Sequence, residues 1–539
     1  MTTLLRTCTL IRLLFILVTA GQQKVQAGNV LAVFPHFGFS HFKVVQPILD
    51  ALAAAGHKVT VISYVKNQNL HENYEQLLIS PLDEDQTNTT INVVPLTEHT
   101  PTRSLPILLK EYWDLHVEGQ HTCELLFASG HVEKVLQRHR QEQPYDVLFT
   151  EYFNADCQLA IAQQLQLPIV ALSTCTLMPF YYDRIDLPDT PAFVQSEFVG
   201  FAQPLKWHER LLNFVQAKLL KLLYRHHSNR VDNALVKRYL NIDVDVAAVA
   251  HAQTAVIFVN QHYTLMGSRP RTRQLVEVGG VHISQKQSKP LPELISRFLQ
   301  QSPLGVIYIS WGSMVRASSI GGDKLADILQ ALQQQPLRVI CKWETDQTPQ
   351  VDAKQFLFIK WAPQLDILCH PKVKLFWTHG GLLGTTEGVH CGKPMLVTPI
   401  YGDQFVNAFA VLNRGIGLKL DYDQINVENL QEALQQLSQP SFATRAQKLA
   451  HIFNERERTP LETAIWALEH VMEHGLFGAE LLRSPGVELN WFVYNSLDSI
   501  FLLLTVLVLA PLLLVYSCRW TCGCKKQSTQ QQKRKSKRA

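Results

Sequence analysis

Val30-Leu31-Ala32-Val33-Phe34 is a short apolar run near the start of the chain, and Val59-Thr60-Val61-Ile62 is a second one. Between them, residues 44–55 carry apolar side chains at helical spacing and stop at Gly56. A strand, a helix and a strand in this order form a right-handed βαβ unit. Parallel strands are covered on both faces, which is why such strands read as unbroken apolar runs. The fold is therefore predicted to begin as α/β.

The same alternation recurs along the chain. Further strands are predicted at 146–150, 169–172 and 255–259, with a helix after Asp156. A polar linker at 285–292, rich in Lys, Gln, Ser and Pro, then precedes a second series. That series has strands at 306–309, 338–341, 375–377 and 395–397 and a helix at 324–334. We predict two Rossmann-like, doubly wound lobes, and a helix at 461–474 that crosses back over the first lobe.

Both ends of the chain resemble membrane signals. Residues 10–20 form an apolar stretch that Arg6 precedes and Arg12 interrupts, and a signal peptide could be cleaved after the small residue Ala20 or Ala27. Residues 500–516 carry no charge and are long enough for a membrane helix, which could start near Trp491. Basic residues follow it, so the orientation rule places the tail in the cytosol and the body in the lumen. A buried strand and a buried core helix are the alternative interpretations of these two segments.

Several weaker signals agree with a lumenal body. Lys535 and Lys537 near the end resemble a dilysine retrieval signal of the endoplasmic reticulum, with a lipid-facing polybasic tail as the alternative. Asn88 opens a glycosylation acceptor motif. Six of the ten cysteines fall in the body without CxxC pairs or zinc spacing, so one or two disulfides are compatible with the sequence but cannot be assigned.

Charge and motifs exclude several functions. The net charge is +4, but the last 21 residues hold eight Lys and Arg, which leaves 42 basic against 46 acidic groups elsewhere. We therefore expect no nucleic-acid partner. No GxGxxG follows the first strand and no GxxxxGK(S/T) occurs, which argues against a dinucleotide oxidoreductase and a P-loop nucleotidase.

The strongest functional signal lies between Trp361 and Gln404. Thr378-His379-Gly380-Gly381 follows a strand and opens a helix, so backbone N–H groups and the helix N-terminus can receive a diphosphate. His379 can donate to a phosphate oxygen without a metal. Glu387 lies about two turns further along, where its carboxylate can accept both ribose hydroxyls.

The flanks of this segment complete a nucleotide-sugar site. Trp361 offers a flat face to a base, and Gln364 offers an amide to the base edge or the ribose. Asp403 and Gln404 follow another strand and can bind sugar hydroxyls.

This ordered set resembles the signature of the UDP-glycosyltransferase family, membrane-bound enzymes that conjugate sugars to small lipophilic acceptors. The resemblance spans nearly the whole chain and implies a GT-B fold with inverting, metal-free transfer, with a UDP-sugar co-substrate and no cofactor. It also implies that Ser310-Trp311-Gly312-Ser313 is the family's second diphosphate loop. The implied donor set is Ser310, Ser313, Trp361, Gln364, His379, Gly380, Gly381, Gly384, Thr385, Glu387, Asp403 and Gln404. Leu383 departs from the family, many of whose members have Asn there, which puts nearby phosphate or sugar contacts in doubt.

The resemblance divides the chain into five parts. These are a signal peptide at 1–27, an acceptor-binding lobe at 28–284, a UDP-sugar-binding lobe at 285–490, a transmembrane helix at 491–518 and a basic cytosolic tail at 519–539. The expected location is the endoplasmic reticulum membrane, in single-pass type I orientation.

A catalytic base is predicted after the first strand, since histidine has a near-neutral pKa. His41 matches the family's base, and His36 is the competing candidate. Its partner carboxylate is Glu151 or Asp156, both after the strand at 146–150, with Glu151 at the family's position.

Donor and acceptor remain open in part. No cation adjoins Asp403 and Gln404 in the sequence, which favours UDP-glucose over UDP-glucuronate. Apolar and aromatic residues at 105–121 and 179–214 predict a lipophilic acceptor, while the oligomeric state, including a homo-oligomer, stays open. The rival functions are a non-catalytic binding protein of the same fold and a transferase that acts on a membrane lipid or glycan.

Overall fold

The structure is a computed structural model that describes residues 27–68, 71–79, 103–283 and 290–537. The predicted glycosylation site at Asn88 and nearly all of the predicted signal peptide lie outside these residues. The chain divides into one compact unit that ends at Arg483 and a second unit that begins at Ser484.

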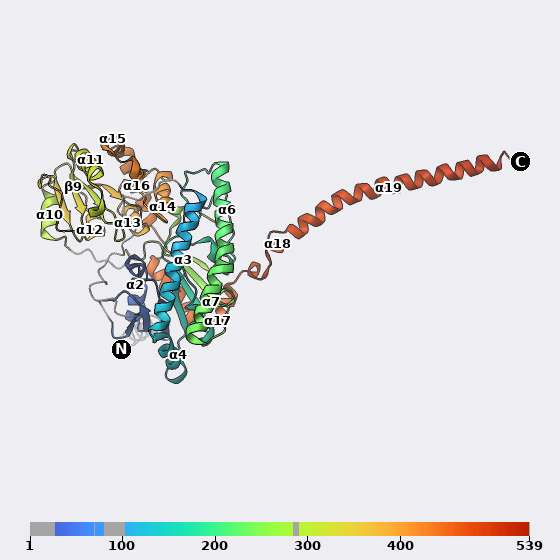
Figure 1. The fold of residues 1–539 in the computed structure, drawn as a ribbon, viewed down its shortest axis with the longest axis horizontal. Helices are drawn as coiled ribbons and strands as arrows, with labels where there is room; N and C mark the ends of the chain where they lie inside the picture. Colours follow the sequence, from blue (N-terminus) through green and yellow to red (C-terminus); the bar gives the residue numbers. More distant parts are fainter. Residues whose placement is uncertain (1–26, 69–70, 80–102, 284–289, 538–539) are drawn as a thin grey trace, which may run out of the picture. The chain divides into compact units, whose positions relative to one another are not determined.

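The first unit contains two parallel sheets. The first sheet has the order β3-β2-β1-β4-β5-β6-β7. Its strands are β1 (Asn29–Phe34), β2 (Lys58–Ser63), β3 (Tyr74–Leu78), β4 (Val147–Glu151), β5 (Ile169–Ser173), β6 (Thr254–Val259) and β7 (Leu275–Glu277). The helices of this lobe are α2 (Phe39–Ala54), α3 (Leu105–Ala128), α4 (His131–Gln141), α5 (Leu159–Leu165), α6 (Trp207–Leu223), α7 (Asn229–Leu240), α8 (Val246–Gln253) and α9 (Tyr263–Met266). The long helices α3 and α6 lie side by side (Figure 1).

The second sheet has the order β10-β9-β8-β11-β12-β13. Its strands are β8 (Val306–Ser310), β9 (Arg338–Lys342), β10 (Phe356–Ile359), β11 (Val373–Thr378), β12 (Met395–Val397) and β13 (Gly417–Lys419). Its helices are α10 (Glu293–Gln300), α11 (Gly322–Gln333), α12 (Gln364–Cys369), α13 (Leu382–His390), α14 (Gln404–Asn413), α15 (Val427–Leu437) and α16 (Pro440–Asn454). The predicted pair of Rossmann-like lobes is therefore confirmed.

Each sheet has apolar layers on both faces. In β1, Leu31 and Val33 point into one buried cluster, whereas Val30, Ala32 and Phe34 point into another. Successive side chains of a strand point to opposite faces of the sheet. A strand whose two faces are both covered by helices is therefore apolar along its whole length. The same division occurs at β8, where alternate residues enter two different clusters.

Helix α17 (Pro460–Leu482) returns to the first lobe, as the sequence predicts. Its buried residues Ala464, Ala467, Leu468 and Val471 belong to the cluster that also contains Val30. The helix begins with a capping box, in which the Thr459 hydroxyl accepts a hydrogen bond from the Glu462 N–H and Glu462 accepts one from the Thr459 N–H. The last helix of the body thus ties the two lobes together.

In the second unit, one helix among the described residues is long and apolar enough to cross a membrane. This segment is Leu497–Trp520, within α19 (Leu497–Lys535). It begins at Leu497 rather than at Trp491, because Ser496 has a φ of 55° and separates α19 from the short α18 (Trp491–Tyr494). Pro511 lies inside α19.

Candidate active site

The first group of predicted residues meets where β1, β4 and β5 end. His41 lies in the first turn of α2, directly after the loop that follows β1, and Glu151 is the last residue of β4. Since β1 pairs with β4 in the sheet, the two side chains come together, and His41 Nδ1 lies 2.6 Å from Glu151 Oε1. The His41 side chain is 19% exposed and that of Glu151 is 4% exposed, so the imidazole faces outward and the carboxylate lies behind it.

Thr174 completes this group, although the sequence did not identify it. Its hydroxyl donates to Glu151 Oε1 at 2.7 Å and lies 2.8 Å from His41 Nδ1. Thr174 directly follows β5, which pairs with β4. The one signal in the sequence that could have identified it is a hydroxyl residue at the end of a predicted strand.

The electrostatics of the pair suit a general base. Burial lowers the pKa of His41, but the charge and hydrogen bond of Glu151, with the charges of Glu118 and Asp403, outweigh burial and raise it above its ordinary value. Burial raises the pKa of Glu151, but His41, His36 and Thr174 together lower it, so this carboxyl group is ionised. An ionised carboxylate accepts a hydrogen bond from a protonated Nδ1 and leaves the other ring nitrogen, Nε2, unprotonated to act as the base.

Asp156 lies in a different environment from His41. It is fully buried and pairs with the Arg184 guanidinium, and Asn229 Nδ2 donates to it at 2.9 Å. Arg184 lies over the rings of Tyr152 and Tyr181. The structure therefore pairs His41 with Glu151, and Asp156 belongs to an ionic cluster in the core.

The competing histidine, His36, has its own carboxylate. Its Nδ1 lies 3.2 Å from Glu118 Oε1, on α3. The ring centroids of His36 and His41 are 4.3 Å apart. Two histidine–carboxylate pairs thus lie next to each other at this end of the first sheet.

In the second lobe, His379 lies between two glycine backbones. It follows β11, and Gly381 is the N-cap of α13. A Cβ at Gly312 would lie 2.5 Å from His379 Cε1, and a Cβ at Gly381 would lie 2.5 Å from His379 Nε2. Gly380 has a φ of 90°, a conformation that favours glycine. Only glycines leave room for the ring in this position.

The charge state of His379 is set by its surroundings. Burial, with the nearby charge of Lys342, lowers its pKa to about 3, so the ring is neutral near pH 7. Lys342 ends β9, and its Nζ donates to the Gly312 carbonyl oxygen. Lys342 was not predicted from the sequence, where the available signal was a cation at the end of a buried parallel strand. Its ammonium group places a positive charge at the predicted diphosphate loop.

Ser310, Ser313 and Thr385 shape the same region. Ser310 is buried at the end of β8, and its Oγ accepts a hydrogen bond from the Gly312 N–H at 3.4 Å. Ser313 is half-buried in the turn that follows. The Thr385 hydroxyl donates to the Gly381 carbonyl oxygen at 3.0 Å, so it stabilises the start of α13.

The predicted base and ribose residues form one network. Gln364 Nε2 donates to Glu387 Oε2 at 2.7 Å, and the Tyr308 hydroxyl donates to Gln364 Oε1 at 3.2 Å. A Cβ at Gly384 would lie 3.3 Å from Gln364 Nε2, so this glycine lets the amide approach α13. Trp361 is 73% exposed, which leaves its ring accessible to a ligand.

Asp403 and Gln404 open α14 but use their side chains differently. Gln404 Oε1 accepts hydrogen bonds from the N–H groups of Ile400 and Tyr401, so it holds the preceding loop. Asn407, which the sequence analysis missed, donates to Asp403 Oδ2 at 3.0 Å and to the Gly380 carbonyl oxygen at 2.9 Å. Burial raises the pKa of Asp403 to about 6, against the opposing effects of Asn407 and His41.

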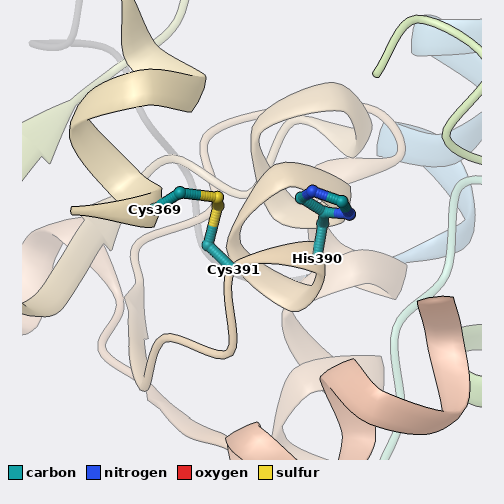
Figure 2. A group of neighbouring side chains, drawn as sticks. All are labelled: Cys369, His390 and Cys391. Carbon is teal, nitrogen blue, oxygen red and sulfur yellow. A yellow bond between two sulfur atoms is a disulfide. The ribbon is translucent and has the colours of Figure 1, made fainter. Parts of the chain in front are cut away.

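One group of metal-ligating residue types occurs among the described residues, namely Cys369, His390 and Cys391. Figure 2 shows that the two cysteines form a disulfide between α12 and the end of α13. Disulfide sulfurs are not thiolates, and His390 Nδ1 lies 2.6 Å from Asn454 Oδ1. The group therefore fits a cross-link rather than a metal centre.

A comparison with protein families matches residues 28–535 to the family described as UDP-glucoronosyl and UDP-glucosyl transferase. UDP-glycosyltransferase UGT5 of Dactylopius coccus is 31% identical over 516 residues, which cover 92% of this chain and 93% of the relative. UDP-glucuronosyltransferase 1A7 of Mus musculus is 28% identical over 520 residues, which cover 93% of this chain and 92% of the relative.

Solved structures show the same fold. Phytolacca americana UGT2, complexed with UDP-2fluoro-glucose and pterostilbene, gives a TM-score of 0.53 at 16% identity and covers 83% of this chain and 99% of its own. A UDP-glucosyltransferase from Polygonum tinctorium gives a TM-score of 0.55 at 15% identity, with 83% and 99% covered. These likenesses show the GT-B arrangement of two Rossmann-like lobes.

Proposed function

The chain belongs to the UDP-glycosyltransferase family and uses a UDP-sugar donor, and we propose that it transfers glucose to a hydroxyl group of a small lipophilic acceptor. The observation that carries this proposal is the 2.6 Å contact between His41 and Glu151 at the end of the first sheet. It supplies an oriented base where ligands of α/β sheets bind. UDP-glucuronate is the second candidate donor, and clearance of lipophilic compounds is the proposed purpose.

In the proposed mechanism, His41 takes the proton of the acceptor hydroxyl, and Glu151 stabilises the resulting imidazolium. The acceptor oxygen attacks the anomeric carbon as the bond to UDP breaks, from the opposite face, so the configuration inverts. Negative charge develops on the leaving diphosphate. Lys342, the neutral ring of His379 and the N–H groups near Gly381 are the groups we assign to stabilise that charge.

We further propose that transfer needs no metal ion, because Lys342 already places a cation at the diphosphate loop. Activity should therefore be the same, within about twofold, with excess EDTA and with added Mg²⁺. The assay is the rate of conjugate formation on metal-depleted membranes. Loss of activity with EDTA and its recovery with Mg²⁺ would contradict this step.

The cellular location is also a proposal. We place the body in the lumen of the endoplasmic reticulum, on the basis of the basic tail and of the disulfides Cys123–Cys157 and Cys369–Cys391. Disulfides persist in oxidising compartments. Protease added to sealed microsomes should remove only the tail. Digestion of the body in sealed vesicles would show the opposite orientation and contradict the proposal.

The function is tested with microsomes that carry the wild-type chain or its His41→Ala variant. UDP-glucose and UDP-glucuronate are each offered with a panel of phenols, steroids and membrane lipids, and conjugates are identified by mass. We expect glucosides that fall by about 10²-fold or more in the variant. His451→Ala is the matched control, because this side chain is 80% exposed on α16. If only glucuronides form, the donor is UDP-glucuronate and not UDP-glucose. The absence of any conjugate would overturn the proposal.

A further inference from the structure

Glu118 is a carboxylate at the reaction site that the proposed mechanism leaves unused. It lies on α3, and its side chain is 32% exposed, whereas that of His36, 3.2 Å away, is 8% exposed. The catalytic pair already has its own carboxylate in Glu151. Glu118 therefore faces outward beside the base without a role in orienting it.

The position of His36 is closely determined. A Cβ at Gly38 would lie 2.6 Å from His36 Nε2 and 3.2 Å from His41 Cδ2, so this glycine separates the two rings. The Phe153 ring packs against both, with centroid distances of 4.9 Å to His36 and 4.5 Å to His41. The Glu118–His36 pair is thus held next to the base, because the His36 ring is in direct contact with the His41 ring.

The charge of Glu118 affects the pKa values of groups in both lobes. Burial lowers the pKa of His41, whereas Glu151 and, to a smaller extent, the charge of Glu118 raise it. Burial and the charges of Asp403 and Glu118 raise the pKa of Tyr401, which lies in the second lobe beside Asp403. The position of Glu118 comes from geometry: its carboxylate lies 3.2 Å from His36, whose ring centroid is 4.3 Å from that of His41, so it lies beside the base that must meet the acceptor.

Two cations near the start of α3 pair with carboxylates other than Glu118. Arg103 donates to both carboxylate oxygens of Glu111, at 2.8 and 2.6 Å, and to the Phe198 carbonyl oxygen. Lys110, further along α3, pairs with Asp114. Among the described residues, the ion-pair partner of Glu118 is therefore His36, and the side chain of Glu118 is 32% exposed.

We propose that Glu118, held beside the base by His36, selects the acceptor by charge and favours acceptors with a cationic amine over those with a carboxylate. This inference rests on the proposed function, because it concerns the acceptor of the same site. A fixed carboxylate attracts a cation and repels an anion, and the effect grows where water is partly excluded. Glu118 is thus a specificity residue, not a catalytic one.

Three phenols of matched size test the proposal on the full-length chain in microsomes. Tyramine carries an ammonium group, tyrosol a neutral hydroxyl and 4-hydroxyphenylacetate a carboxylate, all para to the reacting phenol. We expect kcat/KM to be highest for tyramine and lowest for 4-hydroxyphenylacetate. In Glu118→Gln the ratio between these two should fall by about tenfold, and Glu118→Lys should reverse the order.

The control is Asp114→Asn, since Asp114 lies on the same helix but is exposed and paired with Lys110. It should leave all three values unchanged. The donor KM, measured with tyrosol, reports whether each variant is folded. Equal ratios in wild type and Glu118→Gln would overturn the inference while the transferase stands. If no phenol is conjugated with either donor, it is the proposed function that fails.

Discussion

At the scale of single residues, Glu151 and Asp156 are both carboxylates at the end of β4 or just beyond it, yet they have different partners. Glu151 is the last residue of β4, so the pairing of β4 with β1 brings it to His41. Asp156 lies beyond the strand, where it turns into the core and pairs with Arg184. The sequence left both carboxylates open, because only the sheet order decides which one faces α2.

Glu151→Gln should lower kcat by about 10²- to 10⁴-fold, since the imidazolium loses the charge that stabilises it. The pH profile gives a second readout. His41 acts when unprotonated and its pKa is raised, so wild-type kcat/KM should fall as the pH drops through a value above 6.5. Removal of the Glu151 charge lowers that pKa, so the acid limb should move to lower pH.

Asp156→Asn is the contrasting variant. It leaves Arg184 buried and unpaired, which costs about 3–5 kcal/mol of stability. The Asp156→Asn enzyme should therefore lose activity because it unfolds, which would appear as a lower midpoint of urea-induced unfolding. Glu151→Gln should keep the wild-type midpoint. A normal midpoint and a shifted pH profile in Asp156→Asn would contradict the assignment of Glu151.

The glycines around His379 lead to a second prediction. Gly381→Ala places a Cβ 2.5 Å from the imidazole Nε2, so the His379 ring must leave its present position. We expect kcat/KM for the UDP-sugar to fall by about 10²-fold. Gly321→Ala is the control, because a Cβ there has no neighbour within 4 Å among the described atoms. Equal kinetics for the two variants would show that the ring position is unimportant.

At the scale of elements, α12 and α13 carry the predicted nucleotide residues and are joined at two points. Gln364 at the start of α12 bonds to Glu387 on α13, and the disulfide joins the C-terminal ends of the two helices. Leu383, in the first turn of α13, packs against the apolar cluster of the first lobe. At this position the family signature implies Asn, whereas Leu383 makes an apolar contact between the two lobes.

Removal of this disulfide should loosen the nucleotide site. The bridge spans 22 residues, and its loss in the Cys369→Ser/Cys391→Ser variant should cost about 2–4 kcal/mol of unfolding free energy. Because the disulfide holds the helices of Gln364 and Glu387, the KM for the UDP-sugar should also rise. The Cys123→Ser/Cys157→Ser variant is the matched control, since that bridge lies in the first lobe and should leave the donor KM unchanged.

At the scale of the whole molecule, the chain combines a two-lobed body with a segment that fits a bilayer. Leu497–Trp520 has 24 residues and a mean hydropathy of 2.6. A helix of about 20 apolar residues spans the hydrocarbon core of a membrane. The domain limits and the route of the chain into the membrane remain predictions.

The full chain should remain in the membrane pellet after alkaline carbonate extraction. A variant that ends at Arg483, the last residue of the first unit, should appear in the supernatant and still bind UDP. Immunoblots of both fractions, with UDP binding measured on the released protein, provide the measurement. Retention of the shortened chain in the pellet would show that the body itself binds membranes.

The sequence by itself determined the alternation of buried strands and helices, the His379 segment and the apolar C-terminal helix. Each of these depends on local spacing, which a chain carries without its neighbours. Edge strands such as β3 and β13 were missed, because they are short or partly exposed and lack a continuous apolar run. Thr174, Lys342, Asn407 and both disulfide pairings also needed the structure. They depend on which strand ends lie next to each other, and only the order of strands in the folded sheets decides that.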